Sequence, residues 1–192
     1  MRKLLIPAIV LASSMLALAL PGDLDTTFGV TGGSLISDFA SSQLNERERD
    51  AAIQSDGKLV VVGSRERANL FSDDYLVARY NADGTLDTTF GTGGFFTLFD
   101  GLVDDSANAV AILPDGKIIV AGGAAGSLIA FSAHDGTLLW RSEPRPCGYS
   151  SPQLWQDASG DQVLLLDGVG VHGHDVETGN VLWSADWGDT SE

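Results

Sequence analysis

The sequence of 192 residues predicts an all-β fold made of repeated units of short antiparallel strands. No segment after residue 20 keeps a hydrophobic period of 3.6 residues, and the 23 glycines work against long helices. Short runs rich in β-branched residues are instead joined by Asp-Gly pairs. Such pairs favour tight hairpins, because glycine tolerates the positive φ of these turns. Several strings also occur twice, which is typical of a repeat protein.

Two hairpins are predicted around Asp-Gly turns. The runs "DAAIQ" and "KLVVVG" flank the turn at 55–57, and "NAVAIL" and "KIIVAGG" flank the turn at 114–116. Further strands are predicted at 74–80 and 94–99, because both runs are rich in aromatic and aliphatic residues. The polar stretch "SSQLNERERD" at 41–50 is expected to be a loop.

The first half repeats with a unit of about sixty residues. "LDTTFG" stands at 24–29 and 86–91, and "AAIQSDGKLVVVG" at 51–63 matches "VAILPDGKIIVAG" at 110–122. These strings, over about residues 23–126, resemble the delta-60 repeat family of secreted bacterial proteins. The resemblance implies a β-propeller-like fold and carries over no catalytic residue. The repeat residues expected to be structural are Phe28, Gly29, Phe90 and Gly91.

The second half repeats with a shorter unit. "SLIAFSAHDGTLLW" at 127–140 matches "VHGHDVETGNVLW" at 171–183, an offset of 43 residues. This part, about 127–187, resembles the β-propeller repeats named for pyrroloquinoline quinone. In that family the tryptophan packs between neighbouring blades, so the resemblance implies an architectural role for the residues of the pattern. These are Trp140, Asp175, Thr178, Gly179 and Trp183.

Both resemblances imply blades of antiparallel strands arranged around an axis. About twelve to fourteen strands are expected, which is roughly three to three and a half blades of four strands. We therefore expect an incomplete or open propeller, and a chain that is an N-terminal fragment or an open array. Its exposed sheet edges would favour self-association.

The N-terminus has the features of an export signal. Arg2 and Lys3 precede an apolar run, and Ala17-Leu18-Ala19 provides the small residues of a cleavage site. An uncleaved membrane anchor is the alternative, but the run is short and contains a proline. We therefore expect a signal peptide at 1–19, then blades at 20–126 and 127–192, in a secreted or periplasmic protein without a membrane anchor after cleavage.

Charge and cysteine content exclude several classes of partner and fold. The formal net charge is −15, and removal of the signal peptide leaves 9 basic against 26 acidic side chains. Such an excess of acid argues against nucleic acid and anionic membrane surfaces as partners. Cys147 is the only cysteine, so no intramolecular disulfide forms.

Two groups of residues are candidate metal ligands. "NADGTLD" contains Asp83 and Asp87, which could take part in a calcium site, although the spacing does not fit an EF-hand. His172 and His174 lie two residues apart, which places both on one face of a strand in a geometry suited to zinc. The alternatives are aspartates that cap their own turns and histidines that belong to the core.

The sequence favours a non-enzymatic binding scaffold. Loops of the blades would present a surface to a protein or a glycan. No cofactor is predicted apart from calcium, which stays open. One alternative is part of a quinone-dependent dehydrogenase, which would need a closed propeller, calcium and a vicinal cysteine pair. Another is a propeller factor in outer-membrane protein assembly, which would be expected to carry a lipobox cysteine.

Overall fold

In the computed structural model, the described residues are 26–29, 45–67, 72–98, 105–123, 126–145, 150–158 and 160–187. The expected signal peptide, the only cysteine and the start of the first "DTTFG" lie outside them. All secondary-structure elements within these ranges are β-strands, as the sequence predicts. No helix in the described part of the chain is long and apolar enough to cross a membrane.

The twelve strands form three four-stranded antiparallel sheets. The first sheet contains β1 (Glu46–Ile53), β2 (Leu59–Glu66), β3 (Asp73–Tyr80) and β4 (Phe95–Leu98). The second sheet contains β5 (Ala107–Ile112), β6 (Ile118–Gly122), β7 (Ser127–Phe131) and β8 (Leu138–Arg141). The third sheet contains β9 (Gln153–Asp157), β10 (Gly160–Leu166), β11 (Gly170–Asp175) and β12 (Val181–Asp186).

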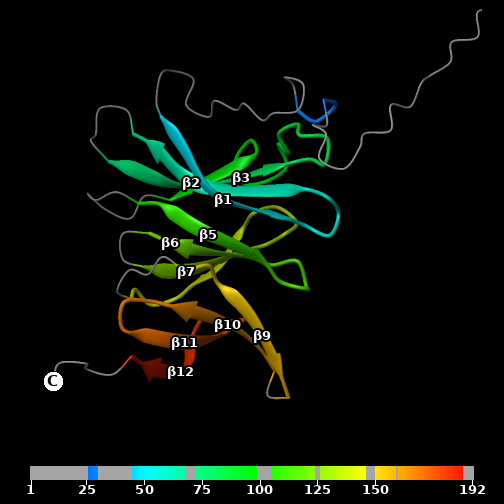
Figure 1. Cartoon of the computed structure of the whole chain (residues 1–192). Helices are drawn as coiled ribbons and strands as arrows, with labels where there is room; N and C mark the ends of the chain where they lie inside the picture. The colour runs from blue at the N-terminus through cyan, green and yellow to red at the C-terminus, as the bar shows by residue number, and fades with distance from the viewer. Residues whose placement is uncertain are drawn as a thin grey trace, which may run out of the picture.

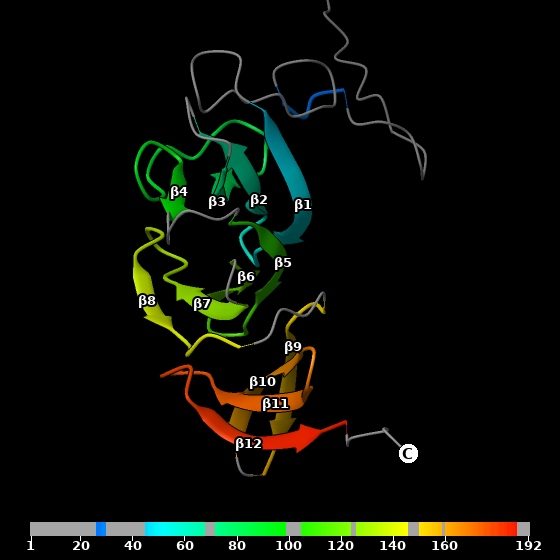
Figure 2. The same ribbon diagram turned by 90° about the vertical axis from the view of Figure 1, so that its left-hand side faces the viewer.

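Each sheet is a meander in which consecutive strands pair as neighbours. The three sheets follow one another through the molecule, with β1, β5 and β9 as the first strand of each (Figures 1 and 2). Over the described residues they form an open series and not a closed ring (Figure 2). The expected boundary at 126/127 falls between β6 and β7, so each half of the chain contributes two strands to the second sheet.

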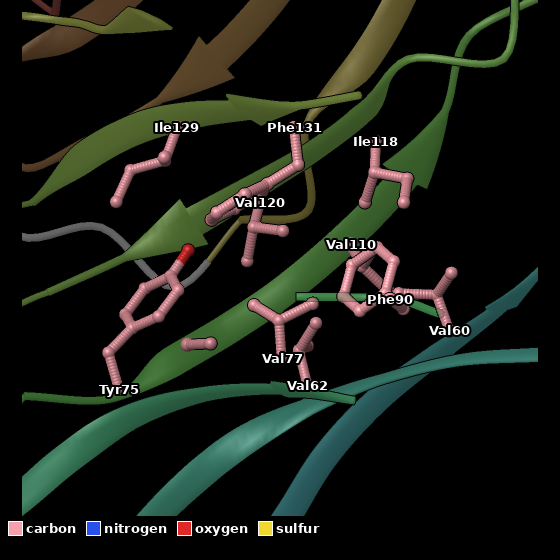
Figure 3. Close-up of a cluster of buried hydrophobic side chains, with 11 residues drawn as sticks. Val60, Val62, Tyr75, Val77, Phe90, Val110, Ile118, Val120, Ile129 and Phe131 are labelled. Atoms are coloured by element: carbon pink, nitrogen blue, oxygen red, sulfur yellow. The ribbon is translucent and has the colours of Figure 1, made fainter. Parts of the chain in front are cut away.

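Two apolar cores separate the three sheets. The first lies between the first and second sheets and includes Val60, Val77 and Phe131 (Figure 3). The second lies between the second and third sheets and includes Leu128 and Val163. Residues of β6 and β7 alternate between the cores because successive side chains of a strand point to opposite faces. The middle sheet is therefore buried on both faces, which explains its uninterrupted apolar runs.

The prediction of a loop over 41–50 is wrong for its second half. Glu46–Asp50 belongs to β1 and pairs with β2, with a register shift between Glu48 and Asp50. The reason is that Asp50 is satisfied by backbone groups on both sides of the shift. Its Oδ1 accepts a hydrogen bond from the N–H of Ala51 at 2.9 Å, and its Oδ2 accepts one from the N–H of Val110 at 2.9 Å. A polar residue thus connects two sheets.

Candidate functional site: the face of the Asp-Gly turns

Five tight turns lie along one face of the molecule, which we call the turn face: residues 54–58, 81–85, 113–117, 132–137 and 175–180. Within a sheet the turns are side by side. A Cβ placed on Gly57 would lie 3.2 Å from the Cβ of Ala82, and one placed on Gly116 would lie 3.2 Å from the Cβ of Ala133. The turn between β1 and β2 and the turn between β5 and β6 project on the same side (Figure 1).

A cleft of about 660 Å³ opens at the turn face. Ile53 and Ile112, the last residues of β1 and β5, line it together with Leu154 of β9, so the first strands of all three sheets contribute. The remaining lining residues belong to the turns: Gln54, Ser55, Asp56, Leu113, Pro114, Asp115, Gly116, Ala133 and His134. Apolar walls with a few polar groups are typical of ligand-binding clefts. Ile53 is 72% exposed, which leaves an aliphatic side chain without cover here.

Gln54 lies at the base of this cleft. The residue is 7% exposed and its backbone closes the turn, since its N–H donates to the carbonyl of Lys58 and its carbonyl accepts from Gly57. Its side-chain Oε1 is buried and makes no hydrogen bond. Because this oxygen is buried inside the protein, it is not accessible to a ligand in the cleft.

The turn face carries an excess of negative charge. The side chains of Asp56, Asp115 and Glu177 are 57%, 49% and 66% exposed. The two lysines of the turns are already bound to acids. Lys58 lies 3.3 Å from Asp87, and Lys117 lies 2.6 Å from both Asp115 and Glu177. Asp83 and Asp135 add two more exposed carboxylates, so the net field of the face is negative.

The two candidate calcium ligands cap their own turns. Asp83 Oδ1 accepts hydrogen bonds from the N–H and the hydroxyl of Thr85 at 2.9 and 2.7 Å, and these bonds lower the pKa of Asp83. Asp87 Oδ1 is held in the same way by Thr89, at 3.1 and 2.6 Å. Thus these carboxylates already have donors that satisfy their negative charge.

Asp87 also forms a buried ion pair. Its Oδ2 lies 2.8 Å from Nε of Arg79, whose side chain is 1% exposed. Although burial raises the pKa of Asp87, the hydrogen bonds from Thr89 and Lys58 and the charge of Arg79 bring it to about 2. Arg79 donates as well to the carbonyls of Ala133 and His134 in the second sheet. This cluster therefore fastens the first sheet to a turn of the second.

The phenylalanines of the two "DTTFG" strings pack on turn glycines. Gly84 and Gly136 both have positive φ, at 80° and 73°. A Cβ on Gly84 would lie 3.3 Å from the ring of Phe28, and one on Gly136 would lie 2.7 Å from the ring of Phe90. The residue after each phenylalanine donates its N–H to the same turn: Gly29 to Asp83 at 2.8 Å and Gly91 to Asp135 at 2.7 Å.

Trp140 makes the corresponding contact between the second and third sheets. A Cβ on Gly179, at φ 73°, would lie 2.4 Å from its ring, and its indole Nε1 donates to the carbonyl of Val176 at 3.1 Å. Asp175 and Thr178 shape the turn that receives it, because Asp175 Oδ1 accepts from the N–H and the hydroxyl of Thr178 at 2.8 Å each. We call these three aromatic–glycine contacts the joints.

Trp183 occupies the same repeat position but has no turn beneath it in the described residues. It is 40% exposed, and its Nε1 donates to Oε1 of Gln162 at 2.6 Å within its own sheet. Its indole covers Gly173 of the neighbouring strand. The repeat residue is thus present, but the described part of the chain supplies no turn that receives Trp183 as the Gly179 turn receives Trp140.

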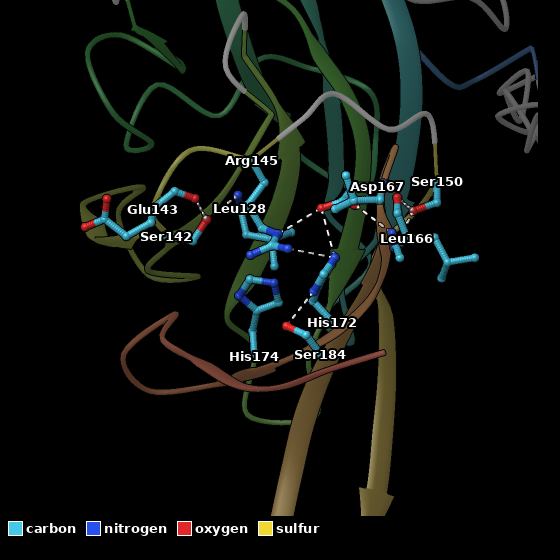
Figure 4. A network of polar contacts seen from close by, with 12 residues as sticks. Leu128, Ser142, Glu143, Arg145, Ser150, Leu166, Asp167, His172, His174 and Ser184 are labelled. Carbon is cyan, nitrogen blue, oxygen red and sulfur yellow. Dashed lines mark hydrogen bonds and ion pairs between the residues drawn. The ribbon is translucent and has the colours of Figure 1, made fainter. Parts of the chain in front are cut away.

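His172 and His174 lie on the face of the third sheet that points towards the second, and both are fully buried (Figure 4). His172 Nδ1 lies 2.8 Å from the hydroxyl of Ser184, and its Nε2 lies 3.1 Å from Asp167 and 2.9 Å from Nη2 of Arg145. Arg145 also donates from Nε to Asp167 at 2.8 Å. Because Arg145 lies between the second and third sheets, this network joins them.

A serine, a histidine and an aspartate in contact resemble a catalytic triad, but the arginine changes the chemistry. Nε2 of His172 faces both a donor, Nη2 of Arg145, and an acceptor, Oδ2 of Asp167. Asp167 is itself paired with the guanidinium of Arg145 and accepts hydrogen bonds from the N–H groups of Val169 and Gly170. We therefore interpret the network as structural.

His174 donates from one ring nitrogen and leaves the other unpaired. Nδ1 lies 3.0 Å from the carbonyl of Gly179, while the buried Nε2 makes no hydrogen bond. Burial lowers the pKa of His174, and the nearby charges of Arg145 and His172 lower it further against the Gly179 hydrogen bond. Within the described residues, no three or more His, Cys, Asp or Glu side chains gather in an arrangement that could hold a metal ion.

Several of these contacts are not visible in the sequence. More than twenty residues separate Arg145 from Asp167, and Asp167 lies five residues before His172. No sequence motif connects the three. From the sequence alone, Arg79 cannot be distinguished from a strand arginine whose charge is exposed to solvent. The only signal for it is its place between apolar neighbours in "LVARY", where a buried charge requires a partner.

Comparisons with known proteins give one family match and similarity to a solved structure. A family described as "Domain of unknown function (DUF5122) beta-propeller" matches residues 54–90, less than a quarter of the chain. The crystal structure of BamB from Moraxella catarrhalis is similar at 17% identity and a TM-score of 0.45, over 79% of this chain and 39% of that one. The chain thus spans about two fifths of that structure. The comparison with curated proteins found no match. The chain is therefore an all-β protein of β-propeller-type sheets, open over its described residues.

Proposed function

We propose that the protein is a non-enzymatic β-propeller binding module, secreted or periplasmic, whose turn face receives a protein partner. The observation that carries this proposal is the cleft of about 660 Å³ into which the first strand of every sheet leads. A cleft lined by strand ends and turns on a rigid sheet scaffold is a common place for recognition. The exposed Ile53 offers an apolar contact there.

The charge of the turn face favours a basic segment as the partner. Exposed Asp56 and Asp115 line the cleft, and Glu177 shares Lys117 with Asp115 beside it. Lys58 is paired with Asp56. Complementary charge steers association and suppresses partners of like charge. Lysine or arginine side chains of the segment would meet the carboxylates, while its apolar side chains could cover Ile53.

A peptide of alternating lysine and leucine, eight residues long, tests the proposal on the full chain. Binding measured by calorimetry at low salt should weaken at least about tenfold in the double variant Asp56→Asn/Asp115→Asn. Glu48→Gln/Glu143→Gln removes the same charge from exposed residues outside the cleft lining and should leave the affinity unchanged. Equal weakening in both double variants would show a non-specific charge effect and would contradict the assignment to the cleft.

Two further measurements separate this proposal from the alternatives. Pyrroloquinoline quinone with calcium should leave the melting temperature unchanged, whereas a clear rise would favour a quinone-dependent enzyme. A neutral oligosaccharide such as maltoheptaose should not compete with the peptide. Competition would reassign the cleft to a glycan and would overturn the choice of a protein partner.

A further inference from the structure

The face of the third sheet that points away from the second carries an uncovered tryptophan at a repeat position. A row of paired residues runs across β10, β11 and β12: Leu164, Gly173 and Trp183. In β10, Leu164 stands between Val163 and Leu165, which belong to the second core. Successive side chains of a strand point to opposite faces, so the row faces away from the second sheet. In the second sheet, the matching row of Ile119, Ala130 and Trp140 faces the third sheet.

Exposed apolar side chains extend across this outer face. Trp155 pairs with Gln162 and therefore shares the face with Trp183, and Leu166 lies four residues further along β10 than Gln162. Trp155, Leu166 and Trp183 are 50%, 37% and 40% exposed. Exposed apolar side chains that gather on one face are a feature of interaction surfaces.

The joints show what kind of structure covers an aromatic residue at this position. Phe28, Phe90 and Trp140 each pack on a turn glycine of the following sheet, and in all three turns the glycine has a φ between 73° and 80°. Such a φ is open to glycine but strained for other residues. Each joint also includes a hydrogen bond to a carbonyl of the receiving turn, from a backbone N–H or from the indole.

We propose that the Trp183 face binds a partner polypeptide through a β-turn with a left-handed glycine, in the geometry of the joints. The indole N–H of Trp183, which donates to Gln162 here, would donate instead to a carbonyl of that turn. A second copy of this chain is a poor occupant. Its glycines at 84, 136 and 179 are already covered, and a Cβ on Gly57 or Gly116 would lie 3.2 Å from an alanine of the adjacent turn. Two chains of net charge −15 also repel each other. The inference concerns a different surface from the cleft and does not depend on it.

The probe is a head-to-tail cyclic peptide that carries residues 171–181 of this chain, with the Thr178-Gly179 turn. Ring closure holds the turn in its bound form, because an open two-stranded hairpin is only marginally stable in water. The peptide contains no tryptophan, so all indole signals come from the protein. The full chain is labelled with 15N-tryptophan and gives four indole N–H signals, which single Trp→Phe variants assign.

The peptide should shift the Trp183 signal and leave the signal of Trp140, which is already in a joint, in place. The Trp183→Ala variant should lose affinity at least about thirtyfold, as expected for a central aromatic anchor. Leu139→Ala removes a side chain that is 45% exposed in another sheet, and serves as the matched control with unchanged affinity. A peptide with alanine in place of the turn glycine should bind much more weakly.

Three results would overturn the proposal. The first is the absence of a Trp183 shift at about 1 mM peptide, a concentration at which weak contacts are still visible. The second is equal binding of the alanine peptide, because a joint has no space for the extra methyl group. The third is equal loss in the Leu139→Ala variant. The cleft variant Asp56→Asn/Asp115→Asn should bind the cyclic peptide normally, which separates this surface from the turn face.

Discussion

Trp140 lies directly against Gly179 of the following sheet, so that a Cβ placed on this glycine would be 2.4 Å from the indole ring. The glycine is required twice over: its φ of 73° is strained for other residues, and the ring occupies the space of a side chain. The same relationship joins Phe90 to Gly136. The repeated aromatic residue and the repeated glycine are therefore two halves of one contact between consecutive sheets.

Gly179→Ala should lower the free energy of unfolding by about 3 kcal/mol, because backbone strain and displacement of Trp140 both contribute. Gly93→Ala is the matched control. Gly93 has a similar φ of 69° but no atom within 4 Å of its added Cβ, so only the strain of about 1–2 kcal/mol should appear. Urea denaturation of both variants measures the difference, and equal losses would show that the joint tolerates a side chain.

Asp87→Asn should destabilise the fold by about 2 kcal/mol at neutral pH, since it leaves the guanidinium of Arg79 buried without its counterion. The pKa of Asp87 falls from 3.8 when unfolded to about 2 when folded. The stabilisation is therefore complete above pH 3.8 and is lost as the pH falls towards 2. The acid unfolding curve of the variant should be correspondingly flatter. A curve that keeps the slope of the wild-type protein would assign the acid transition to other carboxylates.

Stability should also fall as the pH drops below the ordinary value of histidine, because the pKa of buried His174 is lowered in the fold. The unfolded chain then binds a proton that the folded one does not, so this stabilisation is complete above about pH 6.5 and is lost at lower pH. His174→Phe, which places here the residue found at Phe131, should reduce the slope between pH 6.5 and 5. His134→Asn removes an exposed histidine and serves as the matched control.

Asp50→Ala should cost about 1–3 kcal/mol, because the N–H of Val110 in the second sheet loses its acceptor in a buried position. Asp50→Asn keeps a side-chain oxygen at the same place and should cost less than half as much. Chemical denaturation of the pair isolates the hydrogen bond from the charge. Equal losses would indicate that the negative charge, rather than the acceptor, matters at this register shift.

The sequence was sufficient for the parts of the fold that depend on local chemistry. Apolar runs around Asp-Gly pairs predicted the hairpins of the first and second sheets, since turn glycines and alternating burial act within a few residues. It was insufficient at β1, where the strand is stabilised by the contact of Asp50 with Val110, 60 residues away. No local pattern reports a partner at that separation.

The candidate site shows the same division. Asp83 and Asp87 could be assigned as turn residues, but the sequence alone did not show that Asp87 shares its carboxylate with Arg79. The cleft was not foreseen at all, because Ile53, Ile112 and Leu154 are ordinary strand residues that become neighbours only when three sheets are placed side by side. Surfaces formed between repeats depend on their packing angle, which composition does not encode.

The division of β6 and β7 between two cores has a consequence for the dynamics of the protein. Opening the middle sheet would expose apolar surface to water on two sides, whereas the outer strand β12 can separate from β11 with little loss of packing. Backbone amides of Ile119 and Ala130 should therefore be among the slowest to exchange with deuterium, and those of β12 among the fastest. Local unfolding would therefore begin in the third sheet and would not extend to the second without global unfolding. The second sheet would be the most stable part of the protein.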